Sequence, residues 1–169
     1  MKKFLLKMIA IVDSEFGVAK NGKIPWSFEE DLKFFREKTL HSIIIMGRVT
    51  FFSIPNAPLH DRINYVISKS LKSPIPNIEI FSSLESALKN IENFSNFSNK
   101  KIPEVWIIGG ASLYNYALEK DLIDEAFITQ VHQNFYADQF INSKFLKKMN
   151  REIIFSEKNY SIIRFTKKI

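Results

Sequence analysis

The chain of 169 residues contains no cysteine. This absence excludes disulfide bonds, thiolate catalysis and cysteine-ligated metal sites. The three histidines, His41, His60 and His132, are scattered without metal-ligand spacing, so we expect no metal. The sequence also lacks the Gly-x-Gly-x-x-Gly fingerprint and the Walker loop, so a dinucleotide would have to bind through another arrangement.

No apolar run approaches the length of a membrane span, and we expect no membrane partner. Residues 1–7 resemble the start of a signal peptide. However, Lys7 interrupts the apolar run, and Asp13 and Glu15 follow without an Ala-x-Ala-like site. We therefore expect this segment to form a first strand in a cytoplasmic protein.

The composition is that of a globular chain, with 46% hydrophobic and 25% charged residues. The length predicts one domain, spanning residues 1–169. Sixteen phenylalanines predict a phenylalanine-rich core or pocket. The net charge of +6 favours anionic ligands, but the basic residues are dispersed and form no nucleic-acid motif. A nucleotide-sized anion is thus a better candidate than DNA or RNA.

Apolar segments alternate with helical patterns along the chain, which predicts an α/β fold with a mostly parallel sheet. A C-terminal hairpin makes the expected sheet mixed, and a polar repeat at residues 93–100 is expected to be a surface loop. The expected strands are 4–12, 42–46, 63–68, 78–81, 105–108, 126–131, 153–155 and 160–166, and the expected helices follow Ser27 and cover 82–88 and 111–118.

Two Ser-x-x-Glu capping boxes, Ser27 with Glu30 and Ser82 with Glu85, predict where two of these helices begin. In the first helix Phe28, Leu32 and Phe35 recur at helical spacing and predict one buried face.

Asp31 leans onto the edge of that apolar face. A carboxylate there costs free energy unless a ligand binds it. Alternatively, Asp31 belongs to the acidic first turn and only answers the helix dipole. The segment alone leaves both interpretations open.

Three expected strands end in residues suited to a nucleotide, and strand ends are where ligands bind in open α/β sheets. These are Gly47-Arg48-Val49-Thr50, Ser68-Lys69 and Gly109-Gly110-Ala111-Ser112. Glycine lets a phosphate approach the backbone, arginine offers a planar fork, and a helix N-terminus attracts anions. Taken singly each signal is weak, because a Gly-Gly turn also serves close packing.

In order along the chain, these pieces resemble the dihydrofolate reductase family, in particular its bacterial-type, single-domain members. The resemblance runs from about residue 8 to 165. It is carried by Ile9-Ala10, Gly17-Val18-Ala19-Lys20-Asn21-Gly22, Ile24-Pro25-Trp26, Asp31-Leu32-x-x-Phe35, Ile45-Met46-Gly47-Arg48-x-Thr50, Arg62, Ile108-Gly109-Gly110-Ala111, Thr129 and Asp138. The resemblance implies an α/β fold with a mixed, mostly parallel central sheet of about eight strands, an antiparallel C-terminal strand and about four flanking helices.

The resemblance also implies the activity: NADPH-dependent reduction of 7,8-dihydrofolate to 5,6,7,8-tetrahydrofolate in one-carbon metabolism, which supports thymidylate and purine synthesis. Hydride passes from the nicotinamide to the pterin, and the adjacent nitrogen is protonated. The implied partners are dihydrofolate and NADPH, with antifolates such as trimethoprim or methotrexate as plausible inhibitors. The implied oligomeric state is a monomer.

Asp31, Trp26 and Thr129 match the family's catalytic positions. Asp31 is implied to hydrogen-bond the pterin amino group and ring nitrogen, Trp26 to hold a structural water, and Thr129 to bond to Asp31 and, through water, to the pterin. Desolvation should raise the pKa of Asp31 against the helix N-terminus, provided that Phe35 and Leu32 cover it.

Further residues match the substrate pocket. Arg62 is implied to pair with the α-carboxylate of the folate glutamate tail, which suits a bidentate fork, and Tyr114 to reach the nicotinamide side. The full implied set is Ile9, Ala10, Asp31, Leu32, Phe35, Ile54, Leu59, Arg62, Ile108, Tyr114 and Thr129.

For the cofactor, Arg48 and Thr50 match the positions that meet the 2′-phosphate and pyrophosphate, and residues 17–24 match the mobile loop over the nicotinamide. The full implied set is Ile11, Gly17, Val18, Ala19, Ile24, Gly47, Arg48, Val49, Thr50, Ser68, Lys69, Gly109, Gly110, Ala111, Ser112, Leu113 and Gln139.

The chain departs from the family pattern in a few places. Ala19 stands where the family often has glycine, which reduces the freedom of the loop. Ser112 and Gln139 stand where Arg, Gln or Thr is common. Residues 54–60 keep only Pro58-Leu59 of the usual Gly-Arg-Pro-Leu-Pro pattern, which affects the outer folate contacts and antifolate sensitivity.

Two other functions fit parts of the pattern. The pyrimidine reductase of riboflavin synthesis shares the fold and uses NADPH, but Asp31 together with Trp26 and Arg62 argues against it, as does the absence of a cysteine-ligated zinc deaminase half. A catalytically silent nucleotide- or pterin-binding protein would carry the same motifs.

Overall fold

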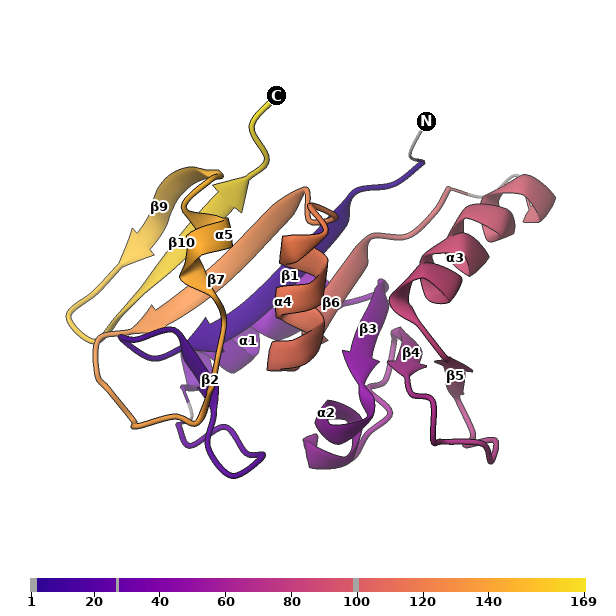
Figure 1. The fold of residues 1–169 in the computed structure, drawn as a ribbon, viewed down its shortest axis with the longest axis horizontal. Helices are drawn as coiled ribbons and strands as arrows, with labels where there is room; N and C mark the ends of the chain where they lie inside the picture. The colour runs from indigo at the N-terminus through magenta and orange to yellow at the C-terminus, as the bar shows by residue number, and fades with distance from the viewer. Residues whose placement is uncertain (1–2, 27, 99–100) are drawn as a thin grey trace.

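The computed structural model describes residues 3–26, 28–98 and 101–169, and its centre is an eight-stranded sheet (Figure 1). The strand order is β5 (Ile78–Phe81), β4 (Ile63–Ile67), β3 (Ile43–Gly47), β6 (Val105–Gly109), β1 (Leu6–Val12), β7 (Glu125–Val131), β10 (Tyr160–Thr166) and β9 (Asn150–Ser156). Neighbours from β5 to β7 pair in parallel, whereas β10 is antiparallel to both β7 and β9. This confirms the predicted mixed α/β fold.

Five helices and a two-stranded sheet complete the described residues. The helices are α1 (Glu29–Thr39), α2 (Arg48–Ser53), α3 (Leu84–Ser98), α4 (Ala111–Glu119) and α5 (Ser143–Leu146), and the small sheet pairs β2 (Gly17–Ala19) with β8 (Gln139–Phe140). No helix in these ranges is long and apolar enough to cross a membrane.

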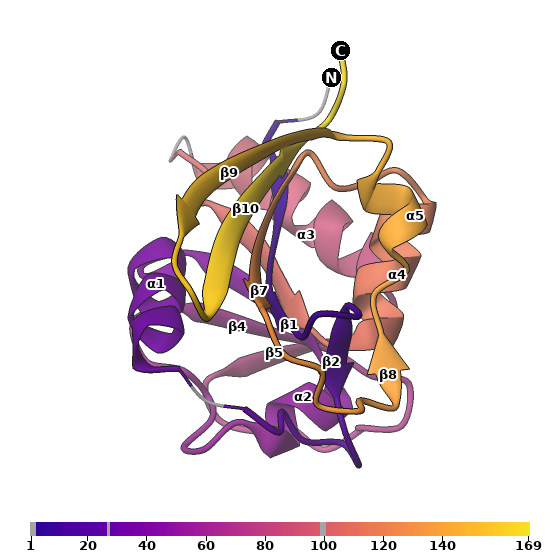
Figure 2. The same ribbon diagram turned by 90° about the vertical axis from the view of Figure 1, so that its left-hand side faces the viewer.

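The central sheet buries a different cluster on each face. Side chains of α3, α4 and α5 pack on one face, and α1 lies across the other (Figure 2). The α1-side cluster is rich in phenylalanine, as the composition predicted: Phe51 and Phe127 are buried in it, and Phe34 and Phe35 of α1 pack against it. The two clusters exist because adjacent residues of a strand point to opposite faces.

The order of the strands fixes where a ligand can bind. Strand β1 lies between β6 and β7, so the strands that follow it in the sequence lie on both of its sides in the sheet. Crevices at the carboxyl ends of such strands are the usual binding sites of open α/β sheets.

The predicted helix starts need correction. Helix α1 begins at Glu29, after Phe28, which makes no side-chain cap, and Ser27 lies outside the described residues. The box predicted from Ser82 and Glu85 is wrong. Instead the Ser83 Oγ accepts from the Ser86 N–H at 3.1 Å and the Ser86 Oγ from the Ser83 N–H at 3.3 Å, which is the same reciprocal arrangement one residue later.

The loop predicted at residues 93–100 is wrong for residues 93–98, because α3 continues to Ser98, and residues 99–100 lie outside the described residues. Leu84, Ala87 and Ile91 are buried at helical spacing and anchor this helix to the sheet. Once a helix is nucleated and anchored, each further residue adds one hydrogen bond at low cost, even where Asn and Ser are poor helix formers. The first strand begins at Leu6 rather than at Phe4.

Candidate active site

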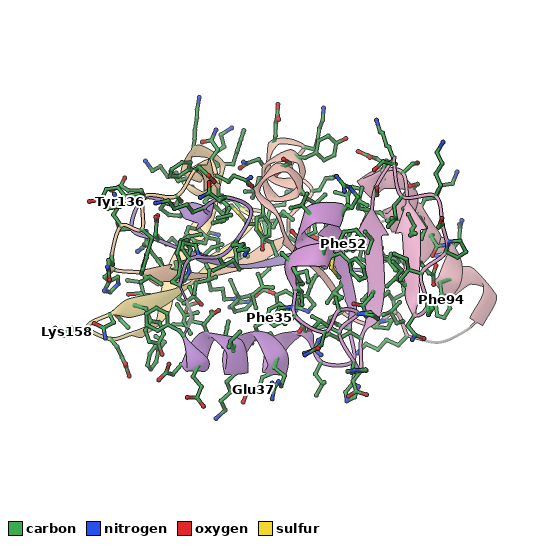
Figure 3. All side chains as sticks on the ribbon, turned by 90° about the horizontal axis from the view of Figure 1, so that it is seen from below. Phe35, Glu37, Phe52, Phe94, Tyr136 and Lys158 are labelled. Carbon is green, nitrogen blue, oxygen red and sulfur yellow. The ribbon has the colours of Figure 1, made fainter. Side chains whose placement is uncertain are left out.

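Asp31 lies on the side of α1 that faces the sheet. The half-buried positions of α1 are Asp31, Phe34, Phe35 and Lys38, and Thr39 is fully buried, so this helix is rotated relative to the predicted apolar stripe. Figure 3 shows Phe35 on the inner side of α1 toward α2, with Glu37 pointing away. Leu32, predicted to be buried, is 57% exposed. Hydrophobic periodicity gave the wrong rotation because a buried carboxylate does not count as apolar.

Burial raises the pKa of Asp31, and a hydrogen bond from the Thr129 hydroxyl lowers it in part. Thr129 is itself buried on β7, which fixes its hydroxyl. Desolvation thus prevails, as expected, although Leu32, one of the two residues expected to cover Asp31, is exposed. Asp31 forms no ion pair with any described residue, so its negative charge is free to bind a ligand.

Trp26 is buried, and its ring packs on Phe135 with centroids 5.0 Å apart. Its indole Nε1 has no hydrogen-bond partner. Among the described residues it is the one buried side-chain N or O atom without a partner. Buried N–H groups are normally bonded. The indole N–H is therefore a donor available to a water or ligand atom.

The predicted apolar pocket residues come together with one exception. Ile9 and Ile108 are buried in the α1-side cluster, and Phe35, Ile54 and Leu59 pack against it, whereas exposed Leu32 does not. The Ala10 side chain belongs to the opposite cluster, as expected from its place next to Ile9 in a strand. Only the backbone of Ala10 can face a ligand on the α1 side.

Tyr114 projects from α4 to the middle of β1, where its hydroxyl donates to the Ile9 carbonyl at 2.7 Å. Burial and the nearby charge of Asp31 raise the pKa of this phenol. The hydroxyl therefore stays protonated, and its hydrogen bond joins α4 to β1.

Arg62 lies at the other end of α1. Its Nε donates to the Thr39 Oγ1 at 2.9 Å and its Nη1 to the His60 carbonyl at 2.7 Å, while its guanidinium lies 5.9 Å from the Phe35 ring centroid. No ion pair to Arg62 occurs among the described residues, and its pKa is lowered by desolvation and by the charge of Arg36. Asp31 and Thr39 are eight residues apart on α1, a rise of about 12 Å, so the apolar wall lies between an anionic and a cationic end.

The cofactor-type motifs meet at the ends of β3 and β6, which are paired through Met46 and Gly109. Gly47 precedes α2 and Gly110 precedes α4, so two helix N-termini lie next to each other. A Cβ on Gly109, where φ is +141°, would approach the Thr50 side chain to 3.2 Å, and one on Gly110 to 3.1 Å. Glycine is required here for close approach of backbone, and the bare amides can meet a phosphate.

Around these glycines the remaining predicted cofactor residues divide by exposure. Arg48, Val49, Lys69 and Ser112 are exposed, whereas Ala111 and Leu113 are buried and offer only their backbone. Ser68, at the end of β4, uses its Oγ to accept the Leu71 N–H at 3.0 Å. Arg48 makes no ion pair within the described ranges, so its fork is open to an anion.

The predicted mobile loop is held at its base by β8. Ala19 pairs with Gln139 in extended conformation, so the family's glycine is not needed here for a positive φ, which falls instead on Asn21 and Gly22. The Asn21 N–H donates to the Asp138 Oδ2 at 2.8 Å. Ile24 at the far end of the loop is exposed, while Val18 and most of Ile11 are covered.

Sequence reasoning missed Asp13, a fully buried carboxylate that joins two loops. Its oxygens accept from the Glu15, Gly17 and Phe135 N–H groups at 2.9, 2.8 and 3.3 Å. A Cβ on Gly17 would lie 2.3 Å from the Ala137 Cβ, so the two loops touch at this point. An acidic residue shortly before a glycine after a buried strand was the available signal.

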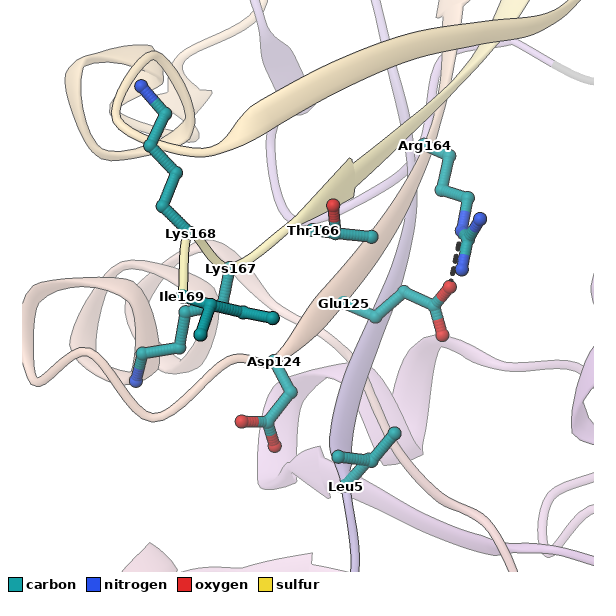
Figure 4. A pocket seen from close by; sticks show the side chains of 8 residues that line it. All are labelled: Leu5, Asp124, Glu125, Arg164, Thr166, Lys167, Lys168 and Ile169. Atoms are coloured by element: carbon teal, nitrogen blue, oxygen red, sulfur yellow. Dashed lines mark hydrogen bonds and ion pairs between the residues drawn. The ribbon is translucent and has the colours of Figure 1, made fainter.

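A separate concavity of about 360 Å³ lies at the amino-terminal end of β7, away from the carboxyl ends of the parallel strands (Figure 4). Its main charges are already paired, Arg164 with Glu125 and Lys167 with Asp121 at 2.8 Å. The candidate cofactor residues lie instead at the carboxyl ends of β3 and β6.

The ends of the parallel strands present bare amides and an unpaired arginine, and a half-buried acid lies beside an apolar cluster. These features are those of an α/β nucleotide-dependent oxidoreductase. These residues fit NADPH, because the glycine pair leaves backbone uncovered and Arg48 remains free for a phosphate.

Comparison with known proteins names the family. The dihydrofolate reductase family model matches residues 5–166. The chain is 41% identical over 145 residues to a viral dihydrofolate reductase of Saimiriine herpesvirus 2 (strain 488), covering 80% of this chain and 68% of the relative. It is 38% identical over 145 residues to dihydrofolate reductase of Bos taurus (80% and 77%) and 37% identical over 153 residues to that of Sus scrofa (85% and 82%).

The chain therefore belongs to the dihydrofolate reductase family, whose members reduce dihydrofolate to tetrahydrofolate with NADPH. The predicted family, activity, enzyme class and cofactor are confirmed. The bacterial-type qualifier stays a prediction, because these relatives come from mammals and a virus.

Proposed function

We propose that residues 1–169 act as one catalytic domain in which Asp31 binds the pterin and takes part in its protonation. The observation that supports this is a half-buried carboxylate with a raised pKa, one hydrogen bond from Thr129 and no ion pair among the described residues. Pterin amino and ring N–H groups would satisfy that charge, and the apolar surround strengthens such bonds. The raised pKa keeps a proton available at higher pH than an ordinary carboxyl would.

Trp26 is proposed to hold the water that lies next to the pterin. Support comes from its buried Nε1, which lacks a partner and can donate to that water. Thr129 orients the Asp31 carboxylate from the β7 side. Together the two residues would set where the water and the carboxyl proton lie, because each is itself held by packing.

The rest of the substrate is proposed to follow α1 from Asp31 toward Arg62. Phe35, Ile54 and Leu59 flank this path, and the exposed Leu32 side chain is apolar surface that a bound substrate would cover. Arg62, held by Thr39 and His60, presents its guanidinium to the α-carboxylate of the glutamate tail.

Bound NADPH supplies the hydride. Arg48 and Thr50 are proposed to meet its 2′-phosphate and pyrophosphate, with Gly109 and Gly110 offering backbone amides. Ser68 and Lys69 border the adenosine end, and residues 17–24 with Gln139 cover the nicotinamide. Residues 17–24, called the lid from here on, exclude water at the nicotinamide, which strengthens the electrostatic contacts of the site.

The protein is proposed to act as a monomer, since one chain contributes Asp31, Trp26 and Arg62 to a complete cleft. A cytoplasmic location accords with the absence of cysteine. Antifolates such as trimethoprim or methotrexate are proposed to bind in the same cleft, where Asp31 offers a charged acceptor to nitrogen-rich rings.

A spectrophotometric assay of NADPH consumption with dihydrofolate tests the roles. Wild type should consume both, Asp31→Asn should lose most activity, and Glu30→Gln should keep it, because Glu30 is an exposed acid of the same helical turn. A wild-type rate in Asp31→Asn would remove Asp31 from catalysis. Intact NADPH binding without consumption in wild type would indicate the catalytically silent alternative.

A further inference from the structure

The side chain of Asn115 on α4 holds the segment that carries β8. Its Nδ2 donates to the Phe140 carbonyl at 2.8 Å, and its Oδ1 accepts from the Asn142 N–H at 2.8 Å. Alternate residues of an extended chain direct their N–H and C=O groups to the same edge. One amide side chain thus takes the place of a neighbouring strand along residues 140–142.

The opposite edge of the same segment holds the lid. Phe140 pairs with Gly17 and Gln139 with Ala19, and the Ile141 N–H donates to the Phe16 carbonyl at 2.9 Å. The Asp138 N–H reaches the Ala19 carbonyl at 3.0 Å. Residues 138–142 are therefore a narrow strip between the lid on one edge and Asn115 on the other. Figure 2 shows β8 beside β2.

This strip has little stability of its own. Strand β8 has two residues, both exposed, and a two-stranded sheet is marginal in water. The buried Ile141 side chain and the bonds to Asn115 attach the strip to the rest of the fold, and Asn142 continues it into α5 as the N-cap of that helix. Loss of these bonds would free one edge of the only strand that pairs with β2 in the described ranges.

Asn115 also sits beside the cofactor region. It follows Tyr114, whose hydroxyl is bonded to the Ile9 carbonyl in the middle of β1, and α4 itself begins after Gly110. Helix α4 thus contacts β1 through Tyr114 and residues 140–142 through Asn115. A rigid helix can hold both at a fixed spacing.

We propose that Asn115 is a positioning residue that sets the lid through β8. It touches no reacting group, and it acts by keeping residues 17–24 in place over the nicotinamide side. The inference rests on the lid role proposed above. Neither the family resemblance nor the motifs included Asn115.

Limited trypsin digestion tests this directly, because Lys20 and Lys23 are exposed in the lid and mass spectrometry identifies cleavage after them. In Asn115→Ala, lid cleavage should be at least about fivefold faster than in wild type. The matched control is Tyr116→Phe, which removes the hydrogen bond from the next residue of α4 to Glu85 on α3 and leaves β8 untouched. The control should cleave at the wild-type rate.

Single-turnover NADPH oxidation provides the second readout, with an expected rate about three- to tenfold lower in Asn115→Ala and unchanged in Tyr116→Phe. Wild-type lid cleavage in Asn115→Ala would overturn the proposal, as would equal acceleration in both variants, which would indicate general loosening of α4. If wild type itself consumed no NADPH, the proposed function would fail. The digestion would still test whether Asn115 holds β8 and the lid in place.

Discussion

Two carboxylates lie on the same face of the sheet and have different surroundings. Glu125, at the start of β7, is 8% exposed, with the Lys7 Nζ 3.4 Å and the Arg164 Nε 2.5 Å away. Asp31 faces Thr129, four residues further along the same strand, and has no cation partner in the described structure. Glu125 is neutralised by the protein itself, whereas Asp31 needs a ligand.

Two arginines repeat the contrast. The hydrogen bond and charge of Glu125 raise the pKa of Arg164, while desolvation and Arg36 lower the pKa of Arg62. Arg62 is bonded to a hydroxyl and carbonyls, which orient its fork without cancelling its charge. Charges that the protein pairs are already neutralised, whereas those that it only orients remain available for binding.

Asp31→Asn should give the largest effect. We expect kcat/KM to fall by about 100-fold or more, because the amide cannot carry the charge or the proton. Folding stability should be retained or increased. Between its ordinary and its raised pKa the folded protein binds the Asp31 proton more tightly than the unfolded chain, so this carboxyl lowers stability as pH rises through that window.

The measurements are NADPH oxidation and urea unfolding at several pH values. Asp31→Asn should lose that part of the pH dependence. A large loss of stability at neutral pH in this variant would mean that Asp31 is a structural group like Glu125, and the contrast would break.

Glu125→Gln should show the reverse pattern. Removing one partner of a mostly buried ion pair should lower the free energy of unfolding by about 2 kcal/mol, with kcat/KM of the folded enzyme unchanged. Glu152→Gln is the matched control, since Glu152 contacts the same Arg164 but is mostly exposed, and its effect should stay within about 0.5 kcal/mol. Equal losses in both variants, measured by urea unfolding, would contradict the role of burial.

Arg62→Lys should raise the KM for dihydrofolate about tenfold with little change in kcat, because an ammonium cannot reproduce the bidentate fork. Steady-state kinetics at saturating NADPH measure this split. A drop in kcat with constant KM would place Arg62 outside the substrate-tail site.

Thr129→Val should have the smallest effect at neutral pH. Loss of its hydrogen bond removes the one contribution that lowers the pKa of Asp31, so this pKa should rise further. If the protonated acid is the active form, the fall of the hydride-transfer rate with pH should move to higher pH. An unchanged pH profile would show that Thr129 does not act through Asp31.

Long periodic or continuous apolar segments were predictable. The runs that became β1, β3, β6 and β7 are buried on both faces and read as strands from composition alone. The short elements β2, α2, β8 and α5 were missed, because they lack a continuous apolar run of four or more residues and their form depends on partners far along the chain.

Only part of the candidate site could be predicted from the sequence. Asp31 and the glycine pairs were proposed from their residue types and their positions, and Arg62 was proposed from the family resemblance. Asn115 was not found, because an asparagine on a helix surface gives no signal until residues 140–142 fold against it.

By itself the sequence determined the class of fold, the family, and which residue types could bind a pterin and a nucleotide, since these follow from local patterns and ordered motifs. Tertiary structure alone decided the rotation of α1, which buries Asp31 and leaves Leu32 exposed, and which charges are paired. Both depend on contacts between segments about a hundred residues apart, such as Asp31 with Thr129 and Lys7 with Glu125. No local pattern encodes the energy of such contacts.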